Sequence, residues 1–576
     1  CIRDSTIPAC AEGKTTTVTK TATVTASPTA SPTETATPTT PVETKWWEEK
    51  WGEPKYGGNL VIRAGTVDLT LQPQDPRASQ YSLWFEALFG DDRLIDREEH
   101  DFTTAFKPTE YMSGWLAKGW EQINPTTYLV EIREGITWQN KPPTYGREFT
   151  AADVEYSYTR AIPDPFWSGF LPNLKEVVAV DDYAVEFRFK SANPMNIFEV
   201  VGPYIAVVQV PHEWYELSEA EQQDWKNAPG TGAFILTDYQ PAVSITGSRN
   251  PDYWGYDERY PDNQLPYLDT MKYIQIQDMA TAISALRSGQ IDVLSDSRDY
   301  PTIAQAETIM SSISDINMTW WLTWGPNVIF RYESEIFSDI NVRRAMQMSL
   351  DRETIAQTYY KGYTVGEPVG FLQPQIGESW VTPYADWPAD IKQYYEYNPE
   401  KAKELLADAG YPNGFETQIL ASTQDDMELL QIMQAYFQDI GVDMEIDAYD
   451  RTTHRALAVD LKYDDMIYEQ GMGQASPPNN ALINFWSETE NRGRFGNVSD
   501  PEFDRLVEKF FNAATLEEAQ EAFKEADMYA MSQHWAVGAC LVPSPQFWQS
   551  WVKGWNGESW WAAWHNIYQA RMWVDK

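Results

Sequence analysis

The chain has 576 residues, 43% of them hydrophobic, so it is long enough for two or more domains with well-filled cores. Its 44 Lys and Arg against 85 Asp and Glu give a net charge of −41, which makes nucleic acid and anionic membranes poor partners. With five His and three Cys, zinc fingers, iron–sulfur clusters and multi-histidine metal centres are largely excluded, and no metal or cofactor is expected.

The N-terminal segment, residues 1–45, predicts a tether. It begins with Cys1, the residue that signal-peptide cleavage and lipid attachment would leave; an arbitrary start is the alternative. Thr fills 14 of the 30 positions from 15 to 44, and no apolar periodicity allows a core there. Since no run of 18 apolar residues follows, we expect membrane contact only through a lipid on Cys1, with an extended Thr/Pro-rich linker behind it.

The body of the chain alternates strand and helix signals from Tyr56 onward. Strands are predicted where apolar residues form short runs or alternate with polar ones, at 59–64, 128–132, 184–189, 291–294 and 442–446. Helices are predicted from apolar spacing and capping residues, at 82–89, from 150 onward, at 280–288, 341–362, 398–410 and 432–440, and at about 500–533. Such mixing indicates an α/β protein with more than one lobe.

Six segments, in order, carry a resemblance to a known family. They are residues 56–60; 132–138 with 149–154; 230–234 with 249–254; 285–292; 337–345 with 351–355; and 401–406 with 409–415. Together they resemble family 5 of the extracellular solute-binding proteins of ABC transporters, the oligopeptide and dipeptide binders. Most of these residues are expected to be structural, and the Arg343–Arg344 and Asp351–Arg352 pairs are expected on solvated or salt-bridged helix faces.

The resemblance implies a two-lobed Venus-flytrap fold of the periplasmic binding protein kind, large cluster C type. Lobe I would hold residues 56–95, 206–318 and 546–576, with an extra subdomain inserted at 96–205. Lobe II would hold 319–545. Two chain crossings, near 319–324 and 541–545, would form a hinge about which the lobes open and close.

The resemblance also places the ligand in the cleft between the lobes. In peptide-binding relatives an aspartate of a lobe II loop pairs with the α-ammonium of the peptide. The matching loop, residues 469–478, contains no Asp, and the aspartate position falls at or near Gly473. Gln470 and Gln474 are neutral groups that suit hydroxyls or amides, so recognition of an α-amino group is in doubt.

Tryptophans near the expected hinge and cleft, including Trp321, would suit the stacking that oligosaccharide recognition needs, and some relatives in the family bind oligosaccharides. The alternative is that each is a core residue. A peptide held mainly through its backbone is equally open. The expected ligand-binding residues are Tyr81, Trp320, Trp324, Gln470, Met472, Gln474 and Trp486.

An enzyme is less favoured, because the sequence has no Gly-x-Ser-x-Gly elbow, phosphate-binding Gly-rich loop or His-Glu-x-x-His helix. Cys540, with His534 nearby in sequence, is expected to be a small buried thiol. A glycoside hydrolase is not excluded by composition. The sequons at 317–319 and 497–499 and the Thr/Pro stalk leave a cell-surface or envelope-layer glycoprotein as a further alternative.

The prediction is therefore a non-enzymatic, extracytoplasmic lipoprotein, periplasmic or on the cell surface. It would capture an oligopeptide or oligosaccharide between its lobes and deliver it to the permease and ATPase subunits of an ABC importer.

Overall fold

The computed structural model describes residues 45–67, 84–104, 106–164, 167, 171, 173–200, 207–296, 299–487, 495–558 and 565–576. The expected tether with Cys1, and the predicted site residue Tyr81, lie outside these residues. The body, Trp46–Lys576, is one compact unit. Within its described residues no helix has the length and apolar character that crossing a membrane requires.

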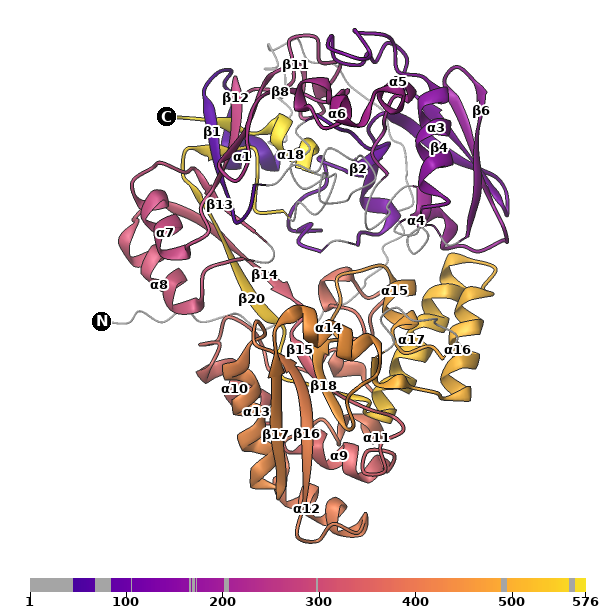
Figure 1. The fold of residues 1–576 in the computed structure, drawn as a ribbon, viewed down its shortest axis with the longest axis vertical. Helices are drawn as coiled ribbons and strands as arrows, with labels where there is room; N and C mark the ends of the chain where they lie inside the picture. The colour runs from indigo at the N-terminus through magenta and orange to yellow at the C-terminus, as the bar shows by residue number, and fades with distance from the viewer. Residues whose placement is uncertain are drawn as a thin grey trace, which may run out of the picture. The chain divides into compact units, whose positions relative to one another are not determined.

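A seven-stranded sheet forms the first part of the body (Figure 1). Its central strand β1 pairs in parallel with β12 and β13, and the outer pairs are antiparallel. The order is β14 (Ile316–Thr323), β20 (Val542–Gln549), β13 (Val293–Leu294), β1 (Asn59–Ala64), β12 (Thr270–Gln275), β9 (Ser244–Arg249) and β8 (Phe234–Gln240). Helices α7 (Met279–Arg287) and α8 (Ile303–Ser312) contribute to one apolar cluster with Leu294 and Phe547.

A four-stranded antiparallel sheet follows from the segment between β2 and β8. Its order is β4 (Ala117–Asn124), β5 (Thr127–Ile132), β7 (Ala184–Phe189) and β6 (Leu174–Asp181), with α3 (Ala151–Ala161) packed against it. The predicted start of α3 is confirmed, since the Thr150 N–H donates to the Asp153 carboxylate at 3.0 Å.

A five-stranded sheet forms the later part of the body, in the order β17 (Val442–Tyr449), β16 (Phe415–Ser422), β18 (Met466–Gln470), β15 (Pro326–Phe330) and β19 (Ala536–Gly538). Strands β17, β16 and β18 are parallel to one another, and β15 runs against β18 and β19. The helices of this part are α9 (Ile340–Met348), α10 (Arg352–Thr358), α11 (Ala389–Lys392), α12 (Pro399–Asp408), α13 (Met427–Asp439), α14 (Arg451–Val459), α15 (Pro478–Ile483), α16 (Pro501–Phe511) and α17 (Leu516–Gln533).

The remaining strands and α-helices of the described residues are short. They are α1 (Trp46–Trp51), β2 (Phe89–Asp91), β3 (Met112–Gly114), α4 (Asn196–Val200), α5 (His212–Glu216), α6 (Glu219–Gln222), β10 (Tyr256–Asp257), β11 (Tyr260–Gln264), β21 (Val552–Lys553), α18 (His565–Arg571) and β22 (Trp573–Val574).

Three predicted helices differ from the structure. The described part of 82–89 is not helical; its residues 84–88 are all buried, so their apolar spacing carried no information about a helix face. The stretch 341–362 breaks into α9 and α10, because Asp351 caps the second helix by accepting from the Thr354 N–H at 2.9 Å. The stretch 500–533 breaks into α16 and α17, where Thr515 caps the second helix.

Two short chain crossings join the seven-stranded and five-stranded sheets. Only Trp324 and Gly325 separate β14 from β15, and residues 539–541 separate β19 from β20. The crossings lie against each other, since a Cβ on Gly325 would meet the Cys540 carbonyl oxygen at 2.5 Å. Glycine is therefore required at 325. The boundaries predicted for the two lobes stay a prediction.

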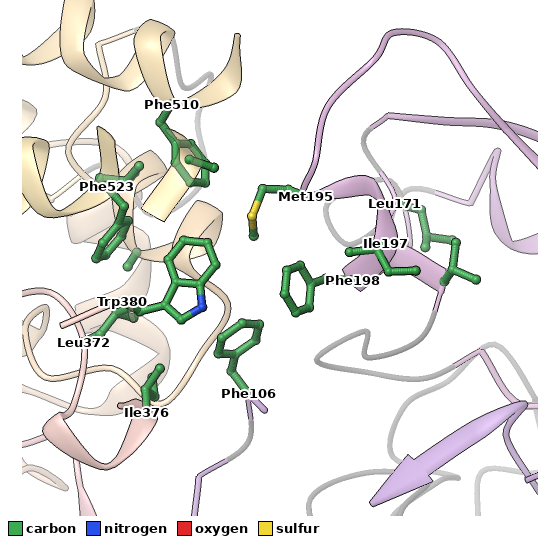
Figure 2. Packing of buried hydrophobic residues seen from close by; sticks show 14 of the residues in the cluster. Phe106, Leu171, Met195, Ile197, Phe198, Leu372, Ile376, Trp380, Phe510 and Phe523 are labelled. Atoms are coloured by element: carbon green, nitrogen blue, oxygen red, sulfur yellow. The ribbon is translucent and has the colours of Figure 1, made fainter. Parts of the chain in front are cut away.

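An apolar contact joins the segment with the four-stranded sheet to the part with the five-stranded sheet (Figure 2). Phe106 and Phe198, from the segment with the four-stranded sheet, pack against Trp380 with ring centroids 6.1 and 6.3 Å away. Phe523 of α17 lies on the far side of Trp380 at 6.0 Å. These rings belong to one continuous buried cluster, so the two parts share a core in this structure.

Candidate ligand-binding site at the strand ends

The candidate site lies where the parallel strands of the two sheets end. In open α/β sheets, ligands bind outside the carboxyl ends of the strands. In the five-stranded sheet these ends lead into three segments: residues 422–426 after β16, 449–451 after β17 and 471–476 after β18. In the seven-stranded sheet β13 leads to Asp296 and Asp299.

The segment 471–476, called the β18 loop below, is fixed by its own side chains. The Gln474 amide nitrogen donates to the Gly471 carbonyl at 2.9 Å, and its amide oxygen accepts from the Ser476 hydroxyl at 2.8 Å. Gln474 is buried. The nitrogen and the oxygen of the Gln474 side-chain amide are thus both hydrogen-bonded within the loop. Gln474, which was predicted to bind the ligand, here stabilises the shape of the loop.

A neighbouring segment holds the β18 loop from behind. The Gly473 N–H donates to the Gly370 carbonyl at 2.9 Å, and the Gln474 N–H donates to the Phe371 carbonyl at 2.7 Å. The Phe371 N–H donates in turn to the carboxylate of Asp527 at 2.8 Å. Burial raises the pKa of Asp527 to about 7, so this carboxyl group titrates near neutrality.

Gly473, at or near which the family's aspartate position falls, is closely surrounded by side chains. Its φ is +68°, in the left-handed region, and a Cβ there would lie 2.6 Å from Leu541 Cδ2 and 3.0 Å from Val369 Cγ2. A side chain at 473 would therefore need a left-handed backbone and a shift of Leu541 and Val369. An acidic partner for a cationic ligand group has to come from elsewhere.

An acidic edge is formed at the ends of β16 and β17 by Asp425, Asp426 and Asp450. Asp425 pairs with Arg451 at 2.7 Å. Asp426 accepts from the Tyr359 hydroxyl at 2.9 and 3.0 Å and caps α13. Asp450 caps α14. Of these three carboxylates only Asp425 is paired with an arginine. Sequence reasoning missed this edge, although an Asp between a strand and a helix was the available signal.

Tyr300, which follows β13, connects this edge to the seven-stranded sheet. Burial raises the pKa of the Tyr300 phenol, and the nearby Asp426 carboxylate adds to the rise. A second bridge is the ion pair of Lys361 with Glu307 at 2.5 Å. Tyr300, from the segment after β13, therefore lies near the acidic edge.

The predicted aromatic residues are partly covered by the protein. Trp320 stacks on Tyr363 with centroids 4.2 Å apart, and Trp486 packs on Phe511 at 5.4 Å. Trp321 is buried and donates to the Gly557 carbonyl at 2.6 Å. Trp324 and Met472 are half-buried beside the crossings. For Gln470 the backbone alone is described, paired with Pro326.

A cavity of about 840 Å³ lies away from these strand ends. It is bordered by β3 and β4 on one side and by residues 253–258 on the other. Two pairs of its charged groups form ion pairs, Lys118 with Glu134 at 3.3 Å and Arg571 with Glu258 at 2.6 Å. We do not assign the solute to it, because it lies away from the carboxyl ends of the parallel strands, where ligands of open α/β sheets bind.

The geometry around Cys540 does not activate its thiol. Burial raises the pKa of Cys540 to about 12, so the nucleophilic thiolate is not formed near neutral pH. The prediction that the Arg343–Arg344 and Asp351–Arg352 pairs lie on solvated or salt-bridged helix faces is wrong for Arg343 and Arg352. Both are buried, and their guanidinium groups donate to backbone carbonyls. Among the described residues, no group of three His, Cys, Asp or Glu side chains is placed to hold a metal ion.

Curated relatives are similar to this chain over most of its length. Heme-binding protein A of Haemophilus influenzae is 25% identical over 445 residues, 73% of this chain and 77% of that protein. Oligopeptide-binding protein AppA of Bacillus subtilis is 25% identical over 458 residues, 76% of this chain and 75% of that protein.

Solved structures share the fold. The periplasmic binding protein DppA of Helicobacter pylori in complex with peptide STSA has a TM-score of 0.67 at 20% identity, covering 92% of this chain and 99% of that chain. AppA of Bacillus subtilis in complex with a nonapeptide has a TM-score of 0.63 at 17% identity, covering 91% and 100%. The predicted fold class, α/β of the periplasmic binding protein kind, is confirmed.

The family of bacterial extracellular solute-binding proteins, family 5 Middle, matches residues 112–493, about two thirds of the chain. This family consists of non-catalytic binding proteins that serve ABC transporters outside the cytoplasm, as predicted. The chain belongs to family 5 of the bacterial extracellular solute-binding proteins.

Proposed function

We propose that this chain is the substrate-binding protein of an ABC importer for peptides or peptide-derived solutes with a free amino group. The solute is captured between the two sheets, and closure about the crossings at 324–325 and 539–541 excludes water around it. The closed form then delivers it to separate permease and ATPase subunits.

The acidic edge of Asp425, Asp426 and Asp450 is the observation that favours a peptide over a sugar as the ligand. Three carboxylates with one arginine leave an excess of negative charge where a ligand ammonium can pair. The aromatic platforms that a sugar needs are less available, because Trp320 and Trp486 already pack on protein rings. The relatives point the same way, since several are named for peptides or glutathione.

A lipid on Cys1, with the Thr/Pro-rich segment as its spacer, would keep the binding protein at the membrane. Replacing Cys1 with Ser should then release the protein from the membrane fraction of the producing cell. Retention of the Cys1→Ser variant in that fraction would contradict the anchor.

The solute is tested by thermal unfolding of the full chain with two panels. One holds tri- to pentapeptides with free and with acetylated amino termini, and the other holds cello-, xylo- and malto-oligosaccharides. A ligand at 100 times its Kd stabilises the fold by about 2.7 kcal/mol. We expect stabilisation by free-amino peptides and none by sugars. Stabilisation by sugars alone would overturn the proposal, and equal effects of free and acetylated peptides would overturn the role of the acidic edge.

A further inference from the structure

Asp527 of α17 is a buried acidic group. Only 1% of the residue is exposed, and its helix neighbours Ala526 and Ala530 belong to the large apolar cluster. Its Oδ1 accepts from the Phe371 N–H at 2.8 Å. No lysine, arginine or histidine of the described residues forms an ion pair with it. Because an unpaired charge in such surroundings is strongly disfavoured, burial raises the pKa of Asp527 to about 7.

The charged and titratable groups around Asp527 are engaged with other partners. On α17, Lys524 donates to a backbone carbonyl at 3.4 Å, and Glu525 pairs with a lysine of α16. Burial raises the pKa of the Tyr395 phenol, Arg352 lowers it, and the charge of Asp527 adds to the rise. The Tyr395 hydroxyl donates to a carbonyl of α17 at 2.9 Å. Within the described residues, the surroundings therefore leave the carboxylate of Asp527 without a neutralising charge.

The segment around Gly370 lies directly on this carboxyl group. A Cβ on Gly370 would collide with both oxygens of Asp527, so the close approach requires glycine. The same segment holds the β18 loop, because the Gly370 carbonyl accepts from the Gly473 N–H at 2.9 Å and the Phe371 carbonyl accepts from the Gln474 N–H at 2.7 Å. Phe371 thus contacts the buried acid through its N–H and the β18 loop through its carbonyl.

We propose that Asp527 is a positioning residue whose protonation state sets how firmly the β18 loop is held. When its carboxyl group is neutral, the Gly370–Phe371 segment stays packed on it and supports the loop. When it is ionised, the packed state must hold an unpaired charge, whereas a state in which the segment moves away lets water reach the carboxylate. Ionisation therefore shifts the population toward a loosened β18 loop. The consequence for solute binding rests on the proposed function, since this loop lies at the candidate site.

The direction and the pH window follow from the pKa of Asp527 in the two states. In the loosened state the carboxyl group is hydrated and has the ordinary pKa of about 4, against about 7 in the packed state. Between these values the loosened state has released a proton that the packed state still holds. Its population relative to the packed state therefore rises by up to about tenfold for each pH unit, and it levels off above pH 7.

The test is amide hydrogen exchange of the ligand-free full chain, read by mass spectrometry on peptides that cover residues 471–476, at pH 5, 6, 7 and 8. After correction for the intrinsic dependence of exchange on pH, protection of the β18 loop in the wild type should fall by up to about tenfold per unit from pH 5 to 7, then level off.

Asp527→Asn keeps an acceptor for the Phe371 N–H without the charge, so protection of its β18 loop should not change with pH. Glu521→Gln is the matched control, because Glu521 is exposed on the same helix and the variant loses the same charge. Its loop should follow the wild type. The same pH profile in wild type and Asp527→Asn would overturn the proposal. Should Asp527→Asn fail to fold, a wild-type loop whose protection is constant from pH 5 to 7 overturns it.

A second measurement separates this proposal from the proposed function. A peptide that stabilises the fold should raise the protection of the β18 loop at pH 7. Stabilisation without any change in loop exchange would overturn the link between Asp527 and solute binding. If no peptide stabilises the chain, the proposed function fails, while the pH profile of the ligand-free protein still decides whether Asp527 positions the loop.

Discussion

The Phe106 N–H donates to the Ala475 carbonyl at 2.7 Å. This bond ties the segment carrying the four-stranded sheet to the β18 loop, so a site loop of one part of the body is held by the other. Asn193 makes a second such bond, donating to the Phe511 carbonyl at 2.8 Å. With the apolar contact of Phe106, Phe198 and Trp380, these bonds join the two parts in this structure.

Phe106→Ala should open the protein as well as destabilise it. Removing a buried phenyl ring costs about 3–5 kcal/mol, and here much of the lost packing lies between the two parts. Small-angle scattering of the ligand-free variant should therefore give a larger radius of gyration. Phe187→Ala is the control, since Phe187 is equally buried but packs on Tyr158 within the four-stranded part. An unchanged radius for Phe106→Ala would show that the contact does not hold the parts together.

Gly473→Ala should be more damaging than Gly135→Ala. Both glycines have positive φ, +68° and +75°, so each alanine costs roughly 1 kcal/mol of backbone strain. A methyl group on Gly135 meets open space, whereas one on Gly473 meets Leu541 at 2.6 Å, adding about 1–3 kcal/mol of overpacking. Chemical denaturation measures the difference. Equal losses of unfolding free energy in the two variants would mean that the β18 loop rearranges to accept the methyl group without further cost.

Local signals in the sequence predicted much of the fold. The Asn398 cap is an example, because its side chain accepts from the Lys401 N–H three residues away. What escaped prediction depends on distant residues. The block at Gly473 comes from Leu541, and the partner of Asp426 is Tyr359, each more than 60 residues away. Burial of Arg352 likewise required the carbonyls of Gly538 and Tyr395, which a helix-face pattern does not reveal.

Asp527→Asn should make the protein more stable at pH 8 and change its pH dependence. The pKa of Asp527 is raised by burial to about 7, well above that of an unfolded aspartate. Between about pH 4 and 7 the folded state therefore holds a proton that the unfolded state has released. As the pH rises through that window, the free energy of unfolding falls by ~1.4 kcal/mol for each pH unit. Asparagine keeps an acceptor for the Phe371 N–H without the charge.

The measurement for Asp527→Asn is urea unfolding of wild type and variant at half-unit steps from pH 4 to 8. The difference in unfolding free energy between the two should grow in favour of the variant as pH rises, then level off above pH 7. Glu199 and other buried groups titrate equally in both proteins and cancel in this difference. A difference independent of pH would contradict the raised pKa of Asp527.

Asp426→Asn should weaken binding of peptides with a free amino terminus. A charge-assisted bond contributes about 1.5–3 kcal/mol, so the expected rise in Kd is roughly 10- to 100-fold by isothermal titration. Asparagine still accepts from Tyr359 and still caps α13, which keeps the local fold. Asp464→Asn is the matched control, because Asp464 precedes the start of β18, at the end of the strands opposite to the acidic edge, where it accepts from Gln418 at 3.0 Å. Equal affinities for Asp426→Asn, Asp464→Asn and wild type would place the ammonium partner outside the acidic edge.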